Sequence, residues 1–316
     1  MPIWGYAMTT QSYARKAAFG WARDPASYIH AYGSYGQPFG TASFHQHWVR
    51  AAHLGTAAPF DAHSPSAMLG NAGRFVMSQS DPALGEFEYG LHIDPRAYVA
   101  MMRAFALHKG VTEVNGDAVG AIQLRSDDGF IAAVANVPGD LFIDCTGQQA
   151  LLRSAIDSEW RSWGAWLKCD RIAIAEEPAS ADPALLDHVV AHDAGWYWHA
   201  GRLGAISNGC VFASAAMADP PSGATSFVQG MRPQPWARNC IAVGDAATVI
   251  EPLEWSNLHL VHSAIDRIVE MLPGRDCAPI ELADYNRQSV AEAERVRDFV
   301  ILHYAVSDRS EPFWQT

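Results

Sequence analysis

The stretch from Phe227 to His262 constrains the fold more than any other part of this 316-residue chain. Residues 239–244 form a short apolar run that ends in glycine, and residues 244–247 (GDAA) contain no side chain larger than a carboxylate. This order predicts a buried strand that opens into a tight turn. Apolar residues then recur at helical spacing over residues 258–272, until Pro273 and Gly274 end the predicted helix.

A strand, a turn of small residues and a helix, in that order, provide a place to hold a charged cofactor. Glycine lets a ligand approach the backbone closely. The start of a helix offers unpaired N–H groups and the positive end of the helix dipole to a phosphate or another anion. The turn at residues 244–247 is therefore the first candidate for a ligand site.

The preceding part of the chain predicts an α/β domain. Asp94 and Pro95 begin a predicted helix with an apolar face that ends at Lys109 and Gly110, because aspartate caps free N–H groups and proline suits the first helical position. A hairpin follows, with its turn at residues 127–129 and strands at 119–124 and 130–134, and then a buried strand at 141–145 that leads to Gly147. This order is typical of the second half of a doubly wound dinucleotide fold.

The chain contains no GxGxxG sequence, which a complete domain of this kind uses for the pyrophosphate. The expected fold is therefore α/β, with an incomplete dinucleotide-binding doubly wound domain, an inserted antiparallel region and C-terminal helices. We assign residues 90–155 and 236–272 to the cofactor part, 1–89 and 156–235 to the substrate region, and 273–316 to the helical end, which includes a long amphipathic helix over 283–304.

Tryptophan is concentrated in the inserted region, where a wall of aromatic rings suits a flat aromatic ligand. Trp196 and Trp198 alternate with Tyr197, so both indoles are expected on one face of a strand, toward the core or a pocket. Ordinary core packing is the alternative, since tryptophan is mostly buried in proteins.

Composition excludes several classes of protein. The formal net charge of −12 argues against binding to nucleic acid or an anionic membrane surface. No run of eighteen apolar residues and no signal peptide is present, and five cysteines without a CxxC spacing suggest reduced thiols. We therefore expect a cytoplasmic protein.

Five histidines fall within residues 28–75, a stretch of weak periodicity that predicts long loops with short strands. His45 and His47 would share one face of a strand. No carboxylate or cysteine near them completes a tetrahedral ligand set at a motif-like spacing, so no metal site is predicted.

Four separated motifs resemble those of one enzyme family. Residues 239–261 read NCIAVGDAATVIEPLEWSNLHLV, residues 195–198 read GWYW, residues 140–147 read DLFIDCTG, and residues 297–304 and 312–314 read RDFVILHY and PFW. Together they are similar to the motifs of the flavin-dependent tryptophan halogenases. The resemblance covers the chain from about residue 12 to residue 314, and it suggests an N-terminally truncated or divergent member. It implies that the doubly wound domain is an incomplete FAD/NAD(P)-binding domain of the flavoprotein monooxygenase type and that the inserted antiparallel region binds the substrate.

The resemblance implies an oxidoreductase that halogenates tryptophan, indole or another electron-rich aromatic. It implies reduced FAD supplied by a separate flavin reductase, with dioxygen and halide as further reactants. Glu254 is implied as the catalytic glutamate, and Lys16 is the candidate for the catalytic lysine, although an ungapped alignment puts Ala14 at that position. Further residues are implied at the flavin (Gly147, Gly244, Asp245, Ala246, Ala247, Thr248, Val249), at the halide (Ser256, Asn257) and in the substrate pocket (Trp196, Trp198, Trp255).

The chain also departs from the family pattern. Trp255 replaces a small hydroxyl residue, Asn257 replaces a glycine, and Ala200 and Gly201 replace isoleucine and proline. Two alternatives therefore stay open: an FAD-dependent aromatic monooxygenase, and a non-catalytic remnant or binding module that binds FAD weakly or not at all. Glu251 or Glu254 could also serve only as a cap for the helix that follows. A homodimer is left open.

Overall fold

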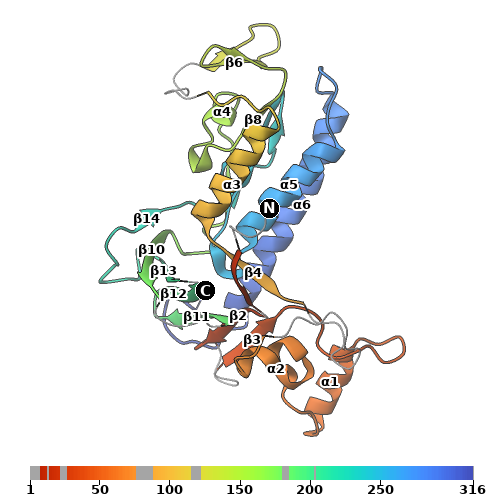
Figure 1. The fold of residues 1–316 in the computed structure, drawn as a ribbon, viewed down its shortest axis with the longest axis vertical. Coiled ribbons are helices and arrows are strands. Elements are labelled where there is room, and N and C mark those ends of the chain that lie inside the picture. The colour runs from red at the N-terminus through yellow and green to blue at the C-terminus, as the bar shows by residue number, and fades with distance from the viewer. Residues whose placement is uncertain are drawn as a thin grey trace.

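The computed structural model describes residues 8–12, 14–21, 27–75, 88–114, 122–179, 185–202 and 204–315. Helices and strands are mixed along the chain, so the fold is α/β as predicted. Figure 1 shows a long hairpin of two helices, α5 (Ser256–Glu270) and α6 (Pro279–Ala305), running from a large sheet at one end to several small sheets at the other. The candidate site lies where this hairpin meets the large sheet.

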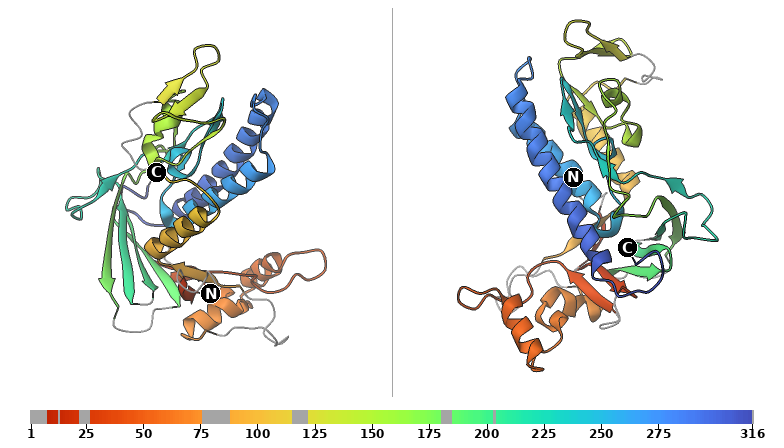
Figure 2. Two further views of the ribbon diagram at one scale, coloured as in Figure 1. Left: turned by 45° about the horizontal axis from the view of Figure 1, so that its top comes forward. Right: turned by 180° about the vertical axis from the view of Figure 1, so that it is seen from behind.

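The large sheet has seven strands in the order β14-β10-β13-β12-β11-β2-β3. Neighbouring strands are antiparallel, except that β11 and β2 are parallel. Figure 2 shows the strands from β10 to β13 side by side in one curved layer. The strands are β2 (Ala14–Phe19), β3 (Ser27–Ala31), β10 (Arg171–Pro178), β11 (Leu186–His192), β12 (Gly195–Arg202), β13 (Ala205–Phe212) and β14 (Thr225–Ser226).

Strand β12 confirms the alternation predicted for its two tryptophans. Trp196 and Trp198 are 0% and 3% exposed, whereas Tyr197 between them is 43% exposed. Both indoles belong to the main core cluster, together with Trp21, Trp163 and residues of α6. Both therefore face the protein interior from one face of the strand.

The small sheets that contain β6 and β8 lie at the other end of the helical hairpin, whereas the two-stranded sheet of β1 and β4 lies next to the large sheet (Figure 1). The predicted hairpin is present, because β5 and β6 pair antiparallel around Gly129 (φ 68°). The strand predicted before Gly147 is β8, which pairs parallel with β17, but it is not buried as predicted, since Ile143 is 48% exposed and Asp144 alone of its residues is buried. The strands are β1 (Met8–Ser12), β4 (Gly90–Ile93), β5 (Ile122–Leu124), β6 (Ile131–Val134), β7 (Val137–Pro138), β8 (Phe142–Asp144), β9 (Arg161–Ser162), β15 (Gly230–Met231), β16 (Trp236–Ala237), β17 (Cys240–Ala242) and β18 (Thr248–Val249).

Residues 28–75, predicted as long loops with short strands, contain strand β3 and loops but also two α-helices that the prediction missed. His45 and His47 lie in helix α1 (Phe44–His53) and not on a strand. The reason is a spacing of four between Phe44 and Trp48, which puts both rings on one helical face, where they pack against Phe60. The other short elements are α2 (Pro65–Asn71), α4 (Leu151–Ser154) and the 3₁₀ turns η2 (Phe60–His63), η5 (Gly147–Gln149), η6 (Gly244–Ala246) and η7 (Pro252–Glu254).

Helix α3 (Pro95–His108) begins where the sequence predicts it. The carboxylate of Asp94 accepts hydrogen bonds from the backbone N–H groups of Arg96 and Ala97 at 2.9 and 3.1 Å. The predicted apolar face is not buried, however, since no residue of α3 is buried and Met102 and Phe105 are 43% and 41% exposed. The sequence pattern therefore predicts the helix correctly but not which of its faces is buried.

The C-terminal tail packs against the core, as expected. Trp314 is 6% exposed, and its indole N–H donates to the carbonyl oxygen of His192 at 2.9 Å. Within the residues that the structure describes, no helix combines the length and the apolar character needed to cross a membrane.

Candidate active site

Glu254 is the last residue of the short turn η7, and its side chain points into the protein. The residue is 5% exposed. Trp255 follows with φ 55°, a left-handed conformation, and occupies the N-cap position, so that α5 begins at Ser256. Glu254 therefore does not cap α5, and the capping role considered from the sequence is wrong.

Two imidazoles from distant elements hold the Glu254 carboxylate. His30, on β3, places Nδ1 2.8 Å from Oε2, and His303, in the last turns of α6, places Nε2 2.8 Å from Oε1. The Glu254 side chain is 2% exposed, that of His303 8% and that of His30 28%. The arrangement is therefore an interior carboxylate with a histidine on each oxygen, open to solvent only on the His30 side.

The backbone of α6 fixes the orientation of the His303 ring. Its Nδ1 lies 2.8 Å from the carbonyl oxygen of Phe299, and a carbonyl oxygen only accepts, so Nδ1 carries the proton and donates it. The Phe299 and Trp21 rings pack edge-on against the imidazole at centroid distances of 5.1 and 6.3 Å. Nε2 is therefore the nitrogen that faces Glu254.

Strand β3 brings further residues to the same place. Tyr28 is largely buried, and burial, together with the Glu254 charge, raises the pKa of its phenol. Lys16, on β2, is directly opposite His30 in the β2–β3 ladder, while Ala14 is opposite Ala31. The side chain of Lys16 lies outside the described residues.

Three tryptophans predicted for the substrate pocket lie in contact with one another. The ring centroids of Trp196 and Trp198 are 5.8 Å apart, and those of Trp198 and Trp255 are 5.5 Å apart in an edge-to-face arrangement. The Trp198 indole N–H donates to the Ser207 hydroxyl at 3.3 Å. Trp198 and Tyr197 also line a cavity of about 370 Å³ beside β10 and β13. Trp196 is fully buried, so of the three only Trp198 and Trp255 border open space.

The two residues implied for a halide lie at the start of α5. Ser256 is the first helical residue, and its hydroxyl oxygen is buried without a hydrogen-bond partner among the described residues. Asn257 is next, and its amide nitrogen donates to the carbonyl oxygen of Ile250 at 2.9 Å, which ties the helix start to the preceding strand. The positive end of the dipole of this 15-residue helix adds to the environment of the Ser256 hydroxyl.

The glycine turns implied for the flavin lie side by side. Gly244 begins η6 with φ 64°, and Gly147 begins η5 with φ 73°, while the buried side chains of Ala150, Ala242 and Ala246 pack between the two turns. A Cβ atom at Gly147 would meet no atom within 4 Å, so this turn faces open space. The Gly147 turn is therefore accessible to a flat or anionic group such as FAD, whereas a Cβ atom at Gly244 would meet Val261 of α5 at 3.3 Å.

The side chains of the Gly244 turn point in different directions. Ala246 and Val249 are buried at 0% and 3% exposure, so only their backbone could contact a cofactor, whereas Asp245 is exposed and Gly244, Ala247 and Thr248 are half-buried. Helices α5 and α6 cover the inner side, where a cavity of only about 30 Å³ remains. A cofactor would therefore meet this turn from its outer side.

A second interior carboxylate, Glu251, has no predicted role beyond helix capping, yet it is completely buried. Its backbone N–H donates to the side-chain oxygen of Gln229 at 2.9 Å, and the Gln229 amide nitrogen lies 3.3 Å from the Glu251 carboxylate. Burial raises the pKa of Glu251 to about 7, although neighbouring hydrogen bonds, those of Tyr304 and Cys169 foremost, oppose the shift. Its position in the sequence, directly before Pro252, does not indicate that its side chain is buried.

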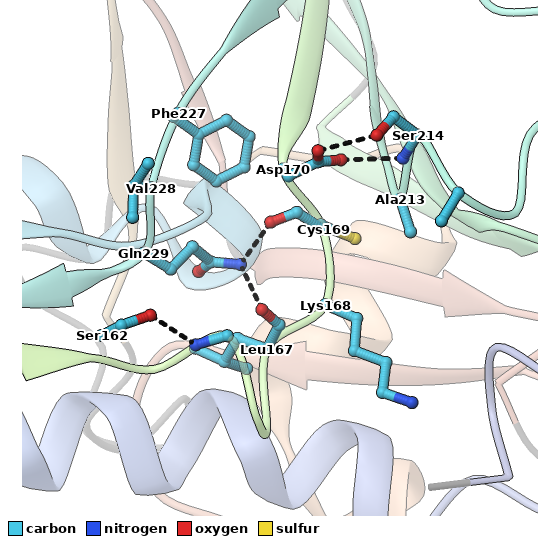
Figure 3. A pocket seen from close by; sticks show the side chains of 12 residues that line it. Ser162, Leu167, Lys168, Cys169, Asp170, Ala213, Ser214, Phe227, Val228 and Gln229 are labelled. Atoms are coloured by element: carbon cyan, nitrogen blue, oxygen red, sulfur yellow. Dashed lines mark hydrogen bonds between the residues drawn. The ribbon is translucent and has the colours of Figure 1, made fainter.

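Gln229 connects Glu251 to a cavity of about 270 Å³. Figure 3 shows the Gln229 amide directed at the carbonyl oxygens of Leu167 and Cys169 on the cavity wall, at 3.4 and 3.0 Å. On the opposite side of the same cavity, Asp170 accepts hydrogen bonds from the backbone N–H and hydroxyl of Ser214, both at 2.7 Å. Glu254 is not among the residues that line this cavity, the cavity beside Trp198, the small cavity at Gly244 or the cavity beside Trp236.

The chain is similar to known proteins of one family. The sequence model of the family described as tryptophan halogenase matches residues 6–316. Two solved structures cover 99% of the chain with a TM-score of 0.90: the flavin-dependent halogenase BrvH from Brevundimonas sp. BAL3, with 32% identity over 69% of its chain, and the flavin-dependent halogenase Xcc4156 from Xanthomonas campestris, with 29% identity over 67%.

A curated relative, tryptophan 7-halogenase RebH of Lentzea aerocolonigenes, is 28% identical over 255 residues, which are 72% of this chain and 48% of the relative. Tryptophan 6-halogenase ThaL of Streptomyces albogriseolus is also 28% identical, over 72% of this chain and 48% of its own length. The chain thus spans about half the length of the curated relatives that it matches.

Proposed function

This chain belongs to the tryptophan halogenase family, and on that premise we propose that it carries the halogenating centre of a flavin-dependent oxidoreductase. The proposed substrate is tryptophan, another indole or a similarly electron-rich aromatic. The proposed reactants are reduced FAD from a separate flavin reductase, dioxygen and halide. The observation that carries the proposal is the interior carboxylate of Glu254, held on both oxygens by histidines.

Glu254 is proposed to accept the proton that the aromatic ring loses. In electrophilic halogenation, an aromatic C–H and hypohalous acid give a carbon–halogen bond and water, and the ring carbon passes through a cationic state. A carboxylate beside that carbon stabilises the positive charge and then takes the proton. The fixed positions of His30 and His303 keep the carboxylate from turning away, which lowers the cost of orienting it in the transition state.

Lys16 is the lysine that we propose to direct the halogenating species. The β2–β3 register supports this choice, because Lys16 is opposite His30, and the His30 ring contacts Glu254. Ala14, at the ungapped family position, is one ladder step away and carries no ammonium group. Lys16 is therefore the only lysine of this strand pair that could act with Glu254.

The start of α5 is the proposed halide position. The Ser256 hydroxyl is a donor without a partner among the described residues, and the helix dipole favours an anion there. The Asn257 amide nitrogen already donates a hydrogen bond to the carbonyl oxygen of Ile250. Its proposed contribution is therefore to hold the start of the helix in place. The side chains of Trp198 and Trp255 supply the neighbouring aromatic surface for the substrate.

The paired turns at Gly147 and Gly244 are the proposed flavin contact. Reduced FAD, when bound, would supply the electrons that activate dioxygen. The chain's own contribution is the accessible backbone of Gly244, Asp245, Ala247 and Thr248, with φ angles at the two glycines that bulkier residues disfavour.

The decisive experiment combines the purified protein with a flavin reductase, FAD, NADH, air and either chloride or bromide, and analyses a panel of indoles and phenols by mass spectrometry. We expect a halogenated product that requires halide and disappears in Glu254→Gln. Glu270→Gln, an exposed glutamate at the end of α5, is the matched control and keeps full activity.

The other outcomes separate the alternatives. A hydroxylated product without halogen would replace the proposal with a monooxygenase. Equilibrium dialysis that detects no FAD binding, together with no product, would favour the binding-module interpretation. Halogenation by Glu254→Gln at the wild-type rate would remove Glu254 from the mechanism.

A further inference from the structure

We propose that His30, Glu254 and His303 together form a binding site for a divalent transition-metal cation, with Zn²⁺ as the representative ion. One ligand atom from each residue lies within 4.8 Å of the other two, and no ion is present. The three residues come from β3, η7 and α6, so the site exists only in the folded protein. Two histidines and one carboxylate form a ligand set that zinc uses in catalytic sites, with a water or substrate in the fourth position.

The distances allow a metal ion after a small adjustment. Zinc bonds of about 2.0–2.1 Å put neighbouring ligand atoms of a tetrahedron about 3.3 Å apart. The nitrogen–oxygen distances of 2.8 Å at Glu254 would each have to open by about half an ångström to reach this spacing. His30 can provide this movement, because its side chain is 28% exposed, and its exposed side also leaves room for a water ligand.

The hydrogen bond of His303 explains why a cation would bind beside its ring. The proton on Nδ1 is donated to the carbonyl oxygen of Phe299, so in the neutral ring Nε2 carries a lone pair. That lone pair faces Oε1 of Glu254 at 2.8 Å, and two acceptors at this distance repel each other unless a positive charge lies between them. A divalent cation supplies this charge, and a second proton on the ring is the competing occupant.

The surroundings of His303 resemble those of metal-bound histidines. Such a histidine usually donates its other ring N–H to a backbone carbonyl or carboxylate, which fixes the tautomer and the ring orientation. Phe299 provides this carbonyl, and the rings of Phe299 and Trp21 hold the imidazole by edge-on contacts. Nε2 is therefore held in the orientation that coordination requires.

A bound cation would have a direct consequence for Glu254. Coordination occupies the lone pairs with which the carboxylate would otherwise accept a proton, so Zn²⁺ acts at this site as an inhibitor of any reaction that uses Glu254 as a base. The proposal does not depend on the halogenase activity, since binding of the metal is measured directly.

The test is a calorimetric titration of the chelator-treated protein with ZnCl₂ alone, at about pH 7.5, where free histidine is mostly neutral. We expect one Zn²⁺ per chain at this site, and affinity at least tenfold weaker in both His30→Gln and His303→Gln. His108→Gln, at the exposed end of α3, is the matched control and binds zinc as the wild type does. Cobalt(II) should give visible absorption bands that are lost in the same two variants.

Two results would overturn the proposal. Absence of zinc binding by the wild-type protein would show that these three residues do not form a metal site. Zinc bound with unchanged affinity in both variants would show that the ion lies elsewhere, for instance at the histidines of α1. If His303→Gln fails to fold by circular dichroism, His30→Gln decides alone, because His30 lies at the edge of the large sheet and is partly exposed.

Discussion

The Nε2 atom of His303 lies 2.8 Å from Oε1 of Glu254, and this contact joins the longest helix of the protein to the acidic loop before α5. The two residues belong to separate sequence motifs, the RDFVILHY segment and the EPLE segment. Their contact gives the C-terminal helix a direct role in orienting the proposed base, in addition to its packing against the core.

Replacing His303 by phenylalanine tests how much this contact stabilises the fold. The ring volume is nearly preserved, but a buried carboxylate oxygen and the Phe299 carbonyl lose their nitrogen partners. We expect the free energy of unfolding to fall by about 2 kcal/mol, in the range for leaving a buried polar group unpaired. Urea denaturation followed by circular dichroism measures it, and an unchanged midpoint would show that the contact contributes nothing. His108→Phe on α3 is the control.

The local order of strand, turn and helix around Gly244 could be predicted, because it depends on residues close together in the sequence. Strand β17, turn η6 and helix α5 follow the expected order, and the period of two in β12 correctly puts Trp196 and Trp198 on one face. Boundaries differ by a few residues, since α6 begins at Pro279 rather than at residue 283.

The partners of Glu254 could not be predicted in the same way. His30 is separated from Glu254 by most of the chain, and His303 is separated from it by the α5–α6 hairpin. Nothing in the local sequence of either histidine indicates that it meets Glu254. The histidine pattern draws attention to His45 and His47, for which no metal site is predicted and which the structure places in α1. The burial of Glu251 and the exposure of the α3 apolar face likewise depend on tertiary packing that periodicity does not contain.

The close packing of Trp198 on Gly209 predicts a strong effect of a single methyl group. A Cβ atom at Gly209 would lie 1.9 Å from the Trp198 ring, so the indole must move, and with it the edge-to-face contact with Trp255. We expect Gly209→Ala to lower the free energy of unfolding by about 2 kcal/mol, as overpacking does, and to raise KM for an aromatic substrate more than it lowers kcat. Gly164→Ala, whose Cβ would meet only the Ser162 hydroxyl oxygen at 3.4 Å, is the control.

The five thiols should differ sharply in reactivity. Cys145 is exposed, whereas Cys169, Cys240 and Cys277 are buried, and burial raises the pKa of Cys240 to about 12. Since the thiolate is the reactive form, a disulfide reagent at mildly alkaline pH should modify Cys145 first and the buried thiols only after denaturation. Loss of the fast phase in Cys145→Ser would confirm the assignment. A fast phase that persists in this variant would contradict it.

Glu251 should make the stability of the protein depend on pH. Its pKa is about 7 in the folded state, against 4.5 for an exposed glutamate, because the completely buried site disfavours the charged form. Between these two values the folded state binds more protons than the unfolded state, so the free energy of unfolding falls as the pH rises from about 4.5 to about 7 and is then constant. The full effect is about 3 kcal/mol, from a shift of that size at about 1.4 kcal/mol per pKa unit.

Glu251→Gln removes the titrating proton while keeping an oxygen that can accept the hydrogen bond from Gln229. We therefore expect the variant to resemble the wild type near pH 5 and to be more stable than the wild type near pH 8, with the difference increasing through the intermediate range. Asp187, whose pKa is raised by burial to about 6, changes stability in the same direction but equally in both proteins, so it cancels in the comparison. Urea titrations of both proteins across this pH range measure the difference. A difference independent of pH would mean that Glu251 is ionised in the folded protein throughout, despite its burial.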